Sequence, residues 1–251
     1  MTSARATPTS PSNTLPDNAF VIGFRDRGTD EYRKRNFDHV LAYVESINLG
    51  PVYVVDDGNT GTAQWNRHKA YNTGAALAFG NGATTATFYE ADMIVPRQQL
   101  VDGITAALDH PHLVIPFNVR HEYNAQQSAA IMAGADPTTF QAPLVKRAPR
   151  RIGAVNIISQ ATYEAVGRWD EQHTGSWFDD RAMGLAFKVC TGRPEQWIPG
   201  PSVHLWHKPG YEGTHLTPED KAATAANRAR FRLYQQAHTK DQMLQLTTGT
   251  R

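Results

Sequence analysis

The chain has 251 residues, of which 40% are hydrophobic and 20% are charged, and its formal net charge is +1. These values are ordinary for a soluble globular protein and exclude a global field that would draw the chain to nucleic acid or membrane. The single cysteine excludes an intrachain disulfide framework, and no apolar run reaches the ~18 residues that would predict a membrane span.

The first 18 residues are rich in Thr, Ser, Pro and Ala and lack an apolar segment. This composition predicts a disordered leader over 1–18 rather than a secretory signal, and we expect a cytoplasmic location. The remaining residues, 19–251, are enough for one large α/β domain.

Hydrophobic runs alternate with helical patterns in the first half of the chain. Helices are predicted at 30–46, 66–80 and 98–109. Strands are predicted at 20–24, 51–55, 84–89 and 112–117. This alternation favours a parallel sheet with helical crossovers, and the nearly all-apolar strands are typical of a sheet covered on both faces.

The second half breaks this rhythm. Residues 118–151 read as a long irregular loop with a basic end, which we predict to be mobile. A helical turn is predicted at 162–166, and the last dozen residues are expected to fray. Longer elements are predicted as a strand at 153–159, a helix at 179–189, an extended segment at 197–206 and a C-terminal helix at 217–237.

Glu90 and Asp92 stand one residue apart at the end of a β-prone run that stops at Pro96. Open α/β sheets bind ligands beyond the carboxyl ends of their strands, and Mg²⁺ or Mn²⁺ commonly takes one or two carboxylates from the protein. The pair therefore predicts a metal site. A solvated turn with a helix-capping Asp is the alternative.

Two further polar motifs lie near strand ends. Asp57, in an Asp-Asp-Gly sequence, can accept hydrogen bonds from a base or ribose, or can simply form a turn. Arg67, His68 and Lys69 open the next helix, where cations are unfavourable for the helix dipole. A bound diphosphate would explain these three residues, and a solvated basic face is the alternative.

Asp179 and Asp180 begin a predicted helix after a loop that carries Trp169 and Trp177. One acid of such a pair can be a general base for an acceptor hydroxyl if its pKa is raised, and the other can hydrogen-bond the acceptor. Helix capping is the alternative for the acids. The tryptophans suit the apolar face of a sugar, although large aromatics are more often core residues.

His204 and His207 lie in a late polar segment without zinc-finger or helical spacing. One imidazole ligand would suit Mn²⁺ better than Mg²⁺, and a structural role is the alternative.

Taken in order, these motifs resemble the GT-A glycosyltransferases, specifically the β-1,4-galactosyltransferase, chondroitin-polymerase and polypeptide GalNAc-transferase group. The most specific match to the pattern Phe-Asn-Arg-x-Lys-x-x-Asn-x-Gly is Trp65-Asn66-Arg67-His68-Lys69-Ala70-Tyr71-Asn72-Thr73-Gly74. Similar segments are found at 24–27, 90–96, 153–154, 167–171, 177–180 and 204–207. The resemblance covers about residues 20 to 215, and the chain departs from the family pattern at Glu90, Ala154, Phe178 and Asp179.

The resemblance implies a single α/β domain of GT-A (Rossmann-like) fold, with a mixed, mainly parallel sheet flanked by helices and a C-terminal helix. It implies a nucleotide-sugar half over 19–117 and an acceptor half over 118–216. The implied activity is transfer of a hexose or N-acetylhexosamine from a UDP-sugar to an acceptor hydroxyl on a protein or glycan. The implied cofactor is Mn²⁺, or Mg²⁺.

The resemblance also implies residue roles. The implied metal ligands are Asp92 with His204 or His207. The implied base of an inverting mechanism is Asp180, and the implied acceptor-binding residues are Asp179, Trp169 and Trp177. Contacts with the nucleotide-sugar are implied for Phe24, Arg25, Arg27, Asp57, Lys69, Asn72, Glu90, Ala91 and Gly153.

Other functions compete with this reading. A nucleotidyltransferase would share the sheet but is expected to carry a Gly-rich basic loop, which residues 25–28 match poorly. An inactive relative would only bind nucleotides or glycans, and the retained acids and histidines argue against it. A third possibility is the same chemistry on a hydroxymethylated base in DNA, with the phosphate backbone bound by Lys146, Arg147, Arg150 and Arg151. The same cations could instead close over the diphosphate or form a solvated loop.

Overall fold

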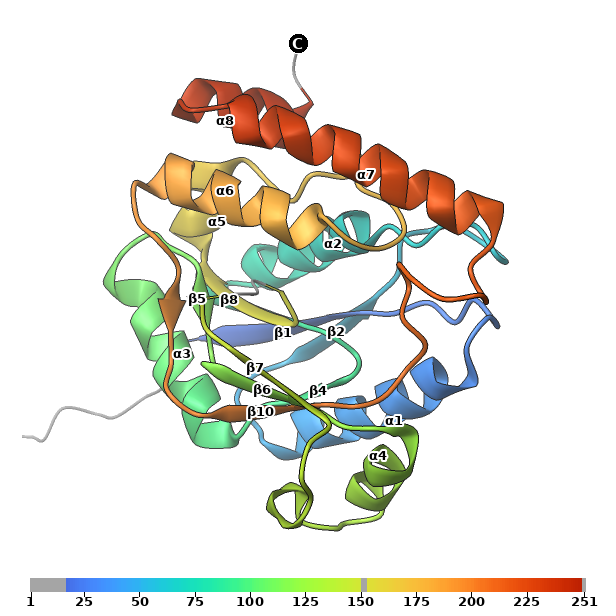
Figure 1. Ribbon diagram of the computed structural model, residues 1–251. Helices are drawn as coiled ribbons and strands as arrows, with labels where there is room; N and C mark the ends of the chain where they lie inside the picture. The colour runs from blue at the N-terminus through green and yellow to red at the C-terminus, as the bar shows by residue number, and fades with distance from the viewer. Residues whose placement is uncertain (1–16, 150–152, 250–251) are drawn as a thin grey trace, which may run out of the picture.

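Two β-sheets organise the chain in a computed structural model that describes residues 17–149 and 153–249 (Figure 1). The larger sheet has six strands, in the order β2 (Val52–Val55), β1 (Asn18–Gly23), β3 (Thr85–Tyr89), β8 (Val155–Ser159), β5 (Val114–Ile115) and β9 (Gln196–Trp197). The smaller has four, in the order β4 (Met93–Ile94), β10 (Pro201–His204), β6 (Val119–Glu122) and β7 (Leu144–Arg147). Of the predicted leader, residues 1–16 lie outside the described residues, and Asn18 already belongs to β1.

The larger sheet is mixed and mainly parallel, as predicted. Strand β1 pairs in parallel with β2 and β3, and β5 pairs in parallel with β9. Strand β8 runs antiparallel to both β3 and β5. The four early strands are confirmed, although the predicted strand at 112–117 is reduced to β5. The extended segment predicted at 197–206 contains β9 and β10, which lie in different sheets.

Helices cover both faces of the larger sheet (Figure 1). Helices α2 (Arg67–Gly80), α5 (Gln160–Val166) and α6 (Asp179–Thr191) lie on one side, and α1 (Glu31–Ser46) and α3 (Arg97–Asp109) lie on the other. Helix α2 approaches β1 closely at Gly74, where an added Cβ would stand 2.1 Å from Cγ1 of Val21. The central strands are therefore buried on both faces, and Phe20, Ile22 and Phe88 are fully buried.

The prediction of an irregular segment over 118–151 was wrong for its described part. It contains β6, α4 (Ala125–Met132), a 3₁₀ helix (Pro137–Thr139) and β7. Asn124 caps α4 with a reciprocal capping box, and β6 pairs with both β10 and β7. All four side chains of β6 are only half-buried, so the strand lacks the apolar alternation that predicts strands. Arg150 and Arg151 lie outside the described residues.

The predicted C-terminal helix is confirmed as α7 (Pro218–Gln236), but the prediction that the last residues fray was wrong. Helix α8 (Lys240–Thr248) follows, starting with a capping box at Thr239. It buries Met243 completely and Thr247 almost completely. Figure 1 shows α7 and α8 stacked outside α6, so they form an outer layer of the fold.

We expect Arg230→Ala to lower the free energy of unfolding by about 3 kcal/mol, because it breaks a buried ion pair. Asp170 is 1% exposed, and Oδ1 of its carboxylate accepts a hydrogen bond from Arg230 at 2.9 Å. The hydroxyl of Tyr234 donates to Oδ2 of the same carboxylate at 2.8 Å, so this network ties α7 to the loop before α6. Urea unfolding measures the effect.

The matched control is Arg232→Ala, which removes an exposed arginine from the same helix and is expected to change the free energy of unfolding by less than about 0.5 kcal/mol. Equal unfolding midpoints for the Arg230 and Arg232 variants would contradict the structural role of the Asp170 network.

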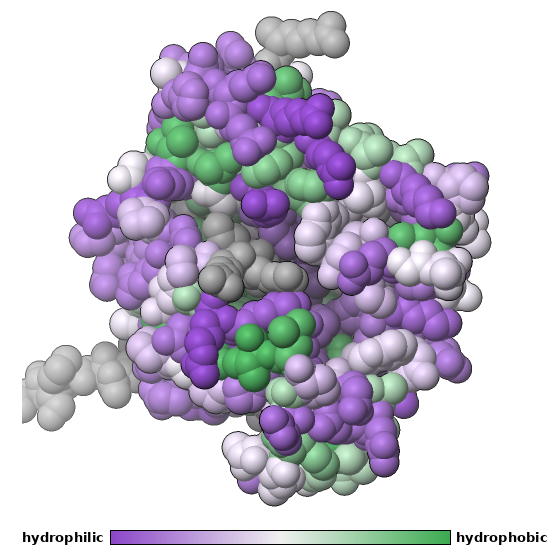
Figure 2. Space-filling model, in the orientation of Figure 1, coloured by the Kyte–Doolittle hydropathy of each residue, from purple (hydrophilic) through white to green (hydrophobic). Residues whose placement is uncertain are grey.

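The face shown in Figure 2 is mostly hydrophilic, with a hydrophobic patch over β7. Leu144 and Val145 of that edge strand are 49% and 40% exposed. None of the helices in the described ranges is long and apolar enough to cross a membrane.

Candidate functional site

Asp92, His204 and His207 form a group that could hold a metal ion, with one ligand atom from each residue lying within 4.8 Å of the others. After β3 the chain turns through residues 90–92 and enters the smaller sheet at β4, which pairs antiparallel with β10. This pairing places Oδ1 of Asp92 3.8 Å from Nε2 of His204, and Oδ2 3.0 Å from Nε2 of His207. Both histidines therefore face the predicted metal ligand.

The electrostatics of this group fit a divalent cation. Oδ1 of Asp92 is buried and has no hydrogen-bond partner among the described residues. Although burial raises the pKa of Asp92, His204 and His207 outweigh it and hold this pKa well below its usual range. Burial lowers the pKa of His204 to about 3, which leaves its imidazole neutral. One carboxylate and two imidazoles suit Mn²⁺ better than Mg²⁺.

Arg67, at the first position of α2, joins three carboxylates. Its guanidinium forms ion pairs with Glu90 and Asp179, and it donates to Oδ1 of Asp180 at 2.5 Å. Burial lowers the pKa of Arg67, but the two aspartates outweigh it and raise this pKa overall. The sequence predicts a diphosphate as the partner of Arg67. In the structure Arg67 instead binds the acid pair, Asp179 and Asp180, beside the turn after β3.

The two aspartates of the pair differ in their protonation. Burial raises the pKa of Asp180 to about 6, with a further contribution from the Asp179 carboxylate and opposition from Arg67. Burial raises the pKa of Asp179, but Arg67 together with His68 and His173 outweighs this effect and lowers the pKa to about 2. A carboxyl group with a pKa close to neutral is suited to general base catalysis, which is the role predicted for Asp180.

The backbone before α6 is strained. Trp177 and Phe178 are non-glycine residues with φ values of 79° and 70°, a conformation that costs about 1–3 kcal/mol per residue. The side chain of Asn227 in α7 donates hydrogen bonds to the carbonyls of Thr174 and Trp177, at 2.9 and 3.1 Å. Helix α7 thus fixes the turn that points the acid pair toward Arg67.

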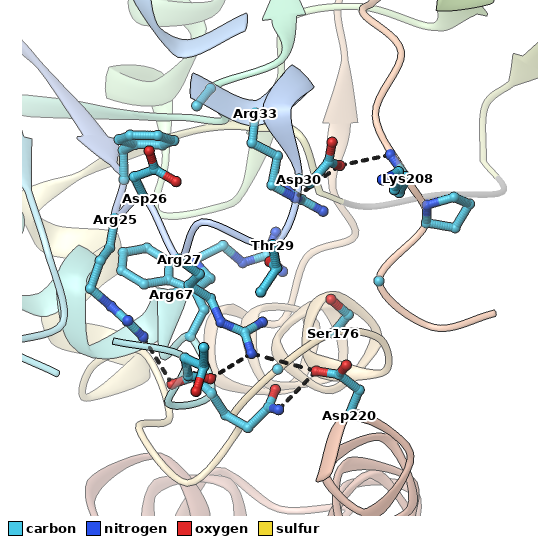
Figure 3. Close-up of a pocket in the computed structure, with 18 of the residues that line it drawn as sticks. Arg25, Asp26, Arg27, Thr29, Asp30, Arg33, Arg67, Ser176, Lys208 and Asp220 are labelled. Carbon is cyan, nitrogen blue, oxygen red and sulfur yellow. Dashed lines mark hydrogen bonds and ion pairs between the residues drawn. The ribbon is translucent and has the colours of Figure 1, made fainter. Parts of the chain in front are cut away.

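A first cavity of about 360 Å³ lies beside the ends of β1 and β3. Its lining includes six residues that were predicted to contact the nucleotide-sugar or the metal: Phe24, Arg25, Arg27, Glu90, Ala91 and Asp92. Figure 3 shows its polar wall, in which Asp30 accepts a hydrogen bond from the backbone N–H of Lys208 at 2.8 Å. On the opposite side Asp220 forms an ion pair with Arg27 at 3.5 Å, so the start of α7 closes this cavity.

A second, larger cavity of about 1210 Å³ adjoins the first. Its lining includes Asp180, His204 and His207, and the two cavities share Arg33, Arg67 and Glu90 in their walls. Trp177, predicted to bind the acceptor, also lines the second cavity and packs against Tyr211 with ring centroids 3.9 Å apart and the ring planes tilted by 30°. The metal-binding group therefore lies where the two cavities meet.

Asp57 and Arg25 form an ion pair at 2.8 Å at the edge of the first cavity. Asp57 is 1% exposed, does not line either cavity, and also accepts hydrogen bonds from Asn59 and from the backbone of Asn66. Arg25 donates further to the carbonyls of residues 61 and 63. Both side chains thus brace the loop after β2, which corrects the expected direct contact of Asp57 with the nucleotide.

Lys69, Asn72 and Trp169 lie away from both cavities. Lys69 is exposed, and the side-chain amide of Asn72 is bonded to the backbone of Trp169 at 2.8 and 3.0 Å. Trp169 is 2% exposed and packs against Tyr71 and Phe88. Trp169 is therefore a core residue, and the prediction that it contacts the acceptor was wrong.

His68, beside them in the sequence, is also a core residue. It is 1% exposed, its Nδ1 lies 2.8 Å from the carbonyl oxygen of Asp170, and burial lowers its pKa to about 4. It is therefore uncharged at neutral pH and is no partner for a diphosphate.

Gly153 packs directly on the predicted base. Its φ is +113°, and an added Cβ would stand 2.3 Å from Oδ2 of Asp180. The next residue, Ala154, also has a positive φ, of 88°, at the position where the family pattern has glycine. The lack of a side chain at Gly153 therefore sets where the carboxylate of Asp180 lies.

We expect Gly153→Ala to displace the carboxylate of Asp180 and, in the glycosyltransferase that the sequence motifs predict, to lower acceptor-dependent transfer about 100-fold while UDP binding is retained. The control is Gly134→Ala, because Gly134 has a similar φ of +98°, but no atom of the described residues lies within 4 Å of an added Cβ. Measuring the rate of UDP release with and without acceptor separates an effect on transfer from an effect on donor hydrolysis. Equal transfer rates in the two variants would contradict the contact.

Sequence reasoning did not single out Arg33 and Arg120 as site residues. Arg33 lines both cavities and lies 3.2 Å from Nδ1 of His207. Arg120 lines the second cavity from β6. Neither belongs to a recognisable motif, and both reach the site only through the packing of α1 and the pairing of the smaller sheet.

Comparison with solved structures identifies the fold. The structure of GalNAc-T7 with UDP, GalNAc and Mn²⁺ matches with a TM-score of 0.50 and 13% identity, over 88% of this chain and 48% of that one. The catalytic domain of Drosophila β1,4-galactosyltransferase 7 in complex with xylobiose matches with a TM-score of 0.46 and 12% identity, over 73% of this chain and 65% of that one. Glucosyl-3-phosphoglycerate synthase from Mycobacterium tuberculosis, in complex with Mn²⁺, UDP and glucosyl-3-phosphoglycerate, matches with a TM-score of 0.49 and 11% identity, over 90% and 85% of the chains.

The match to GalNAc-T7 places the chain in a class of proteins defined by their fold. The match to GalNAc-T7 shows a GT-A fold, as the sequence motifs predict. This chain spans about half the length of the GalNAc-T7 chain and 65% of the galactosyltransferase chain. No protein-family model and no curated protein matches the sequence.

Proposed function

We propose that this chain is a metal-dependent glycosyltransferase that moves a hexose or N-acetylhexosamine from a UDP-sugar to an acceptor hydroxyl on a protein or glycan. The proposal is carried by one observation: Asp92, His204 and His207 lie where two cavities meet, and Asp180 lies in the second cavity. The GT-A fold, and the UDP and Mn²⁺ in the GalNAc-T7 structure, support the same assignment. The cytoplasmic location stays a prediction.

The first cavity suits the nucleotide of the donor. Phe24 and Trp65 offer aromatic surface there, and Arg27 and Lys208 offer positive charge. The diphosphate would then reach Asp92 at the inner end of this cavity. Mn²⁺ bound by Asp92, His204 and His207 would supply Lewis-acid stabilisation of the departing nucleoside diphosphate.

The second cavity suits the acceptor. Asp180 removes the proton of the acceptor hydroxyl while that oxygen attacks the anomeric carbon, and the bond from this carbon to the donor phosphate breaks. Arg67 donates to Oδ1 of Asp180 and so fixes the orientation of the carboxylate. A base in this position is the arrangement expected for an inverting transfer.

A panel of UDP-sugars with Mn²⁺ tests the proposal. We expect at least one donor to be hydrolysed or transferred, followed as UDP release, and we expect UDP with Mn²⁺ to raise the melting temperature. If no donor reacts and UDP with Mn²⁺ causes no thermal shift, the chain is not an active transferase of this kind.

We expect acceptor-dependent transfer to fall about tenfold between pH 7 and pH 5. Asp180 acts as a base only when deprotonated, and its pKa is raised to about 6. About nine tenths of it is then deprotonated at pH 7 and about one tenth at pH 5. Binding of UDP with Mn²⁺, measured at each pH, is the control. A transfer rate that stays constant down to pH 5 would contradict the assignment.

A further inference from the structure

One face of the smaller sheet presents charged side chains to the second cavity. In the parallel pairing of β10 with β6, His204 lies opposite Glu122, and in the antiparallel pairing of β6 with β7, Arg120 lies opposite Lys146. Residues directly opposite each other, and residues two apart in a strand, point to the same face of a sheet. These four side chains therefore share one face, and all of them line the cavity.

Arg120 and Lys146 are like charges held directly opposite each other, which is an unfavourable pairing. Oε1 of Glu122 bridges them, because it accepts from Arg120 at 2.8 Å and also from the ammonium group of Lys146. Both cationic side chains are only 15% exposed. Nε of Arg120 is buried without a hydrogen-bond partner among the described residues, so these residues do not use the full donor capacity of this guanidinium.

Arg120 lies within electrostatic range of both functional acids. Burial lowers its pKa, and the carboxylates of Asp92 and Asp180 oppose this effect. Neither Arg120 nor Lys146 lines the first cavity, where the nucleotide is expected. An anionic group bound by these two cations would therefore lie on the acceptor side, in the cavity that Asp180, His204 and His207 also line.

We propose that the acceptor carries a carboxylate or a phosphate group, which Arg120 and Lys146 bind while its hydroxyl reaches Asp180. This inference rests on the proposed function and narrows its substrate to an anionic acceptor. Arginine and lysine form charge-assisted hydrogen bonds to both kinds of anion, so the site accommodates a uronic acid or a sugar phosphate. The low exposure of both cations favours a narrow group entering the cavity over the backbone of a duplex.

The test is calorimetric titration of the full-length protein, in buffer with chelator, with glucuronate, glucose 6-phosphate and glucose. These three compounds share a ring and differ in charge. We expect the two anions to bind and glucose not to bind. Arg120→Gln and Lys146→Gln should each weaken anion binding about tenfold or more, because each removes a charge-assisted hydrogen bond. Lys188→Gln removes an exposed cation from the wall of the same cavity and should leave anion binding unchanged.

Three results would overturn the inference. The first is equal binding of glucose and the anions, or no binding of any of them. The second is wild-type anion affinity in both glutamine variants, which are used together so that poor folding of one does not decide the result. The third is competition for binding between the sugar anions and UDP with Mn²⁺. This result would mean that Arg120 and Lys146 bind the diphosphate of the donor.

Two further measurements separate this inference from its alternatives. A thermal shift with UDP and Mn²⁺ tests the proposed function independently. If UDP with Mn²⁺ binds but the sugar anions do not, only the inference of an anionic acceptor is rejected. If the sugar anions bind but UDP with Mn²⁺ does not, the proposed transferase function is rejected. A duplex with hydroxymethylated bases should bind no better than an unmodified duplex. A different result would favour DNA as the acceptor instead of a small anionic compound. In that case the hydroxymethylated duplex binds in a salt-sensitive way, both glutamine variants lose this binding, and the sugar anions do not bind.

Discussion

Replacing Asp92 with Ala is expected to lower metal-dependent UDP release about 1000-fold and to remove the thermal shift caused by Mn²⁺ with UDP. Asp92 is the only carboxylate in the candidate metal-binding group of the described residues, and it is 6% exposed. Without it, only the two imidazoles of the group would remain to hold a divalent cation beside a diphosphate. Lewis-acid stabilisation of a leaving group contributes several kcal/mol, and each 1.36 kcal/mol corresponds to about tenfold in rate.

Two variants make this result specific. Asp92→Asn keeps the volume of the buried side chain and is expected to lose the same activity, so a cavity effect alone would not explain the loss. Asp56→Asn changes an exposed acid at the end of β2 that lines neither cavity, and it should behave as the wild type. A full Mn²⁺ response in Asp92→Ala would show that the metal binds elsewhere.

The metal-binding group could be anticipated because each of its members belongs to a motif. Asp92 follows a strongly apolar strand, and His204 lies in a segment whose place in the chain resembles a family pattern. The sequence nevertheless left the choice between His204 and His207 open. The structure brings both imidazoles to the same carboxylate, because β10 pairs with β4 and His207 lies in the loop that follows β10.

The partners of Arg67 could not be anticipated. A cation at the start of α2 is unfavourable for the helix dipole, and this signal indicates a nearby anion without identifying it. In the structure the anions are the protein's own: Glu90 from the turn after β3, and Asp179 and Asp180 from a helix more than 100 residues away. Sequence spacing carries no information about such a contact.

The smaller sheet was missed for a related reason. Side chains of β6 face a polar cavity, so Arg120 and Glu122 occupy positions where a buried strand would carry apolar residues. Periodicity detects elements that bury one hydrophobic face, and a strand that lines a functional cavity lacks this pattern. The residue pattern of β6 therefore does not indicate the strand that it forms. Such disagreements between sequence pattern and structure are expected at functional sites, and β6 lines the candidate site.

Replacing Asp180 with Ala is expected to abolish transfer while binding of UDP with Mn²⁺ is kept. General base catalysis contributes about 10²- to 10⁴-fold, so transfer should fall at least 100-fold. Asp180 lines the second cavity but not the first, and it is outside the group formed by Asp92 and the two histidines. The pH dependence below about pH 6 should disappear in the residual activity of this variant, because the titrating group is gone.

A helix-capping role for Asp180 makes a different prediction, and α8 supplies the matched control. Asp180 is the second residue of α6, and Asp241 is the second residue of α8. Removing either acid costs the interaction with the positive helix end, about 0.3–1 kcal/mol, and Asp180→Ala also removes the hydrogen bond from Arg67. Only the Asp180 variant should lose transfer. If both variants retained transfer, Asp180 would be a cap and the base would be another group.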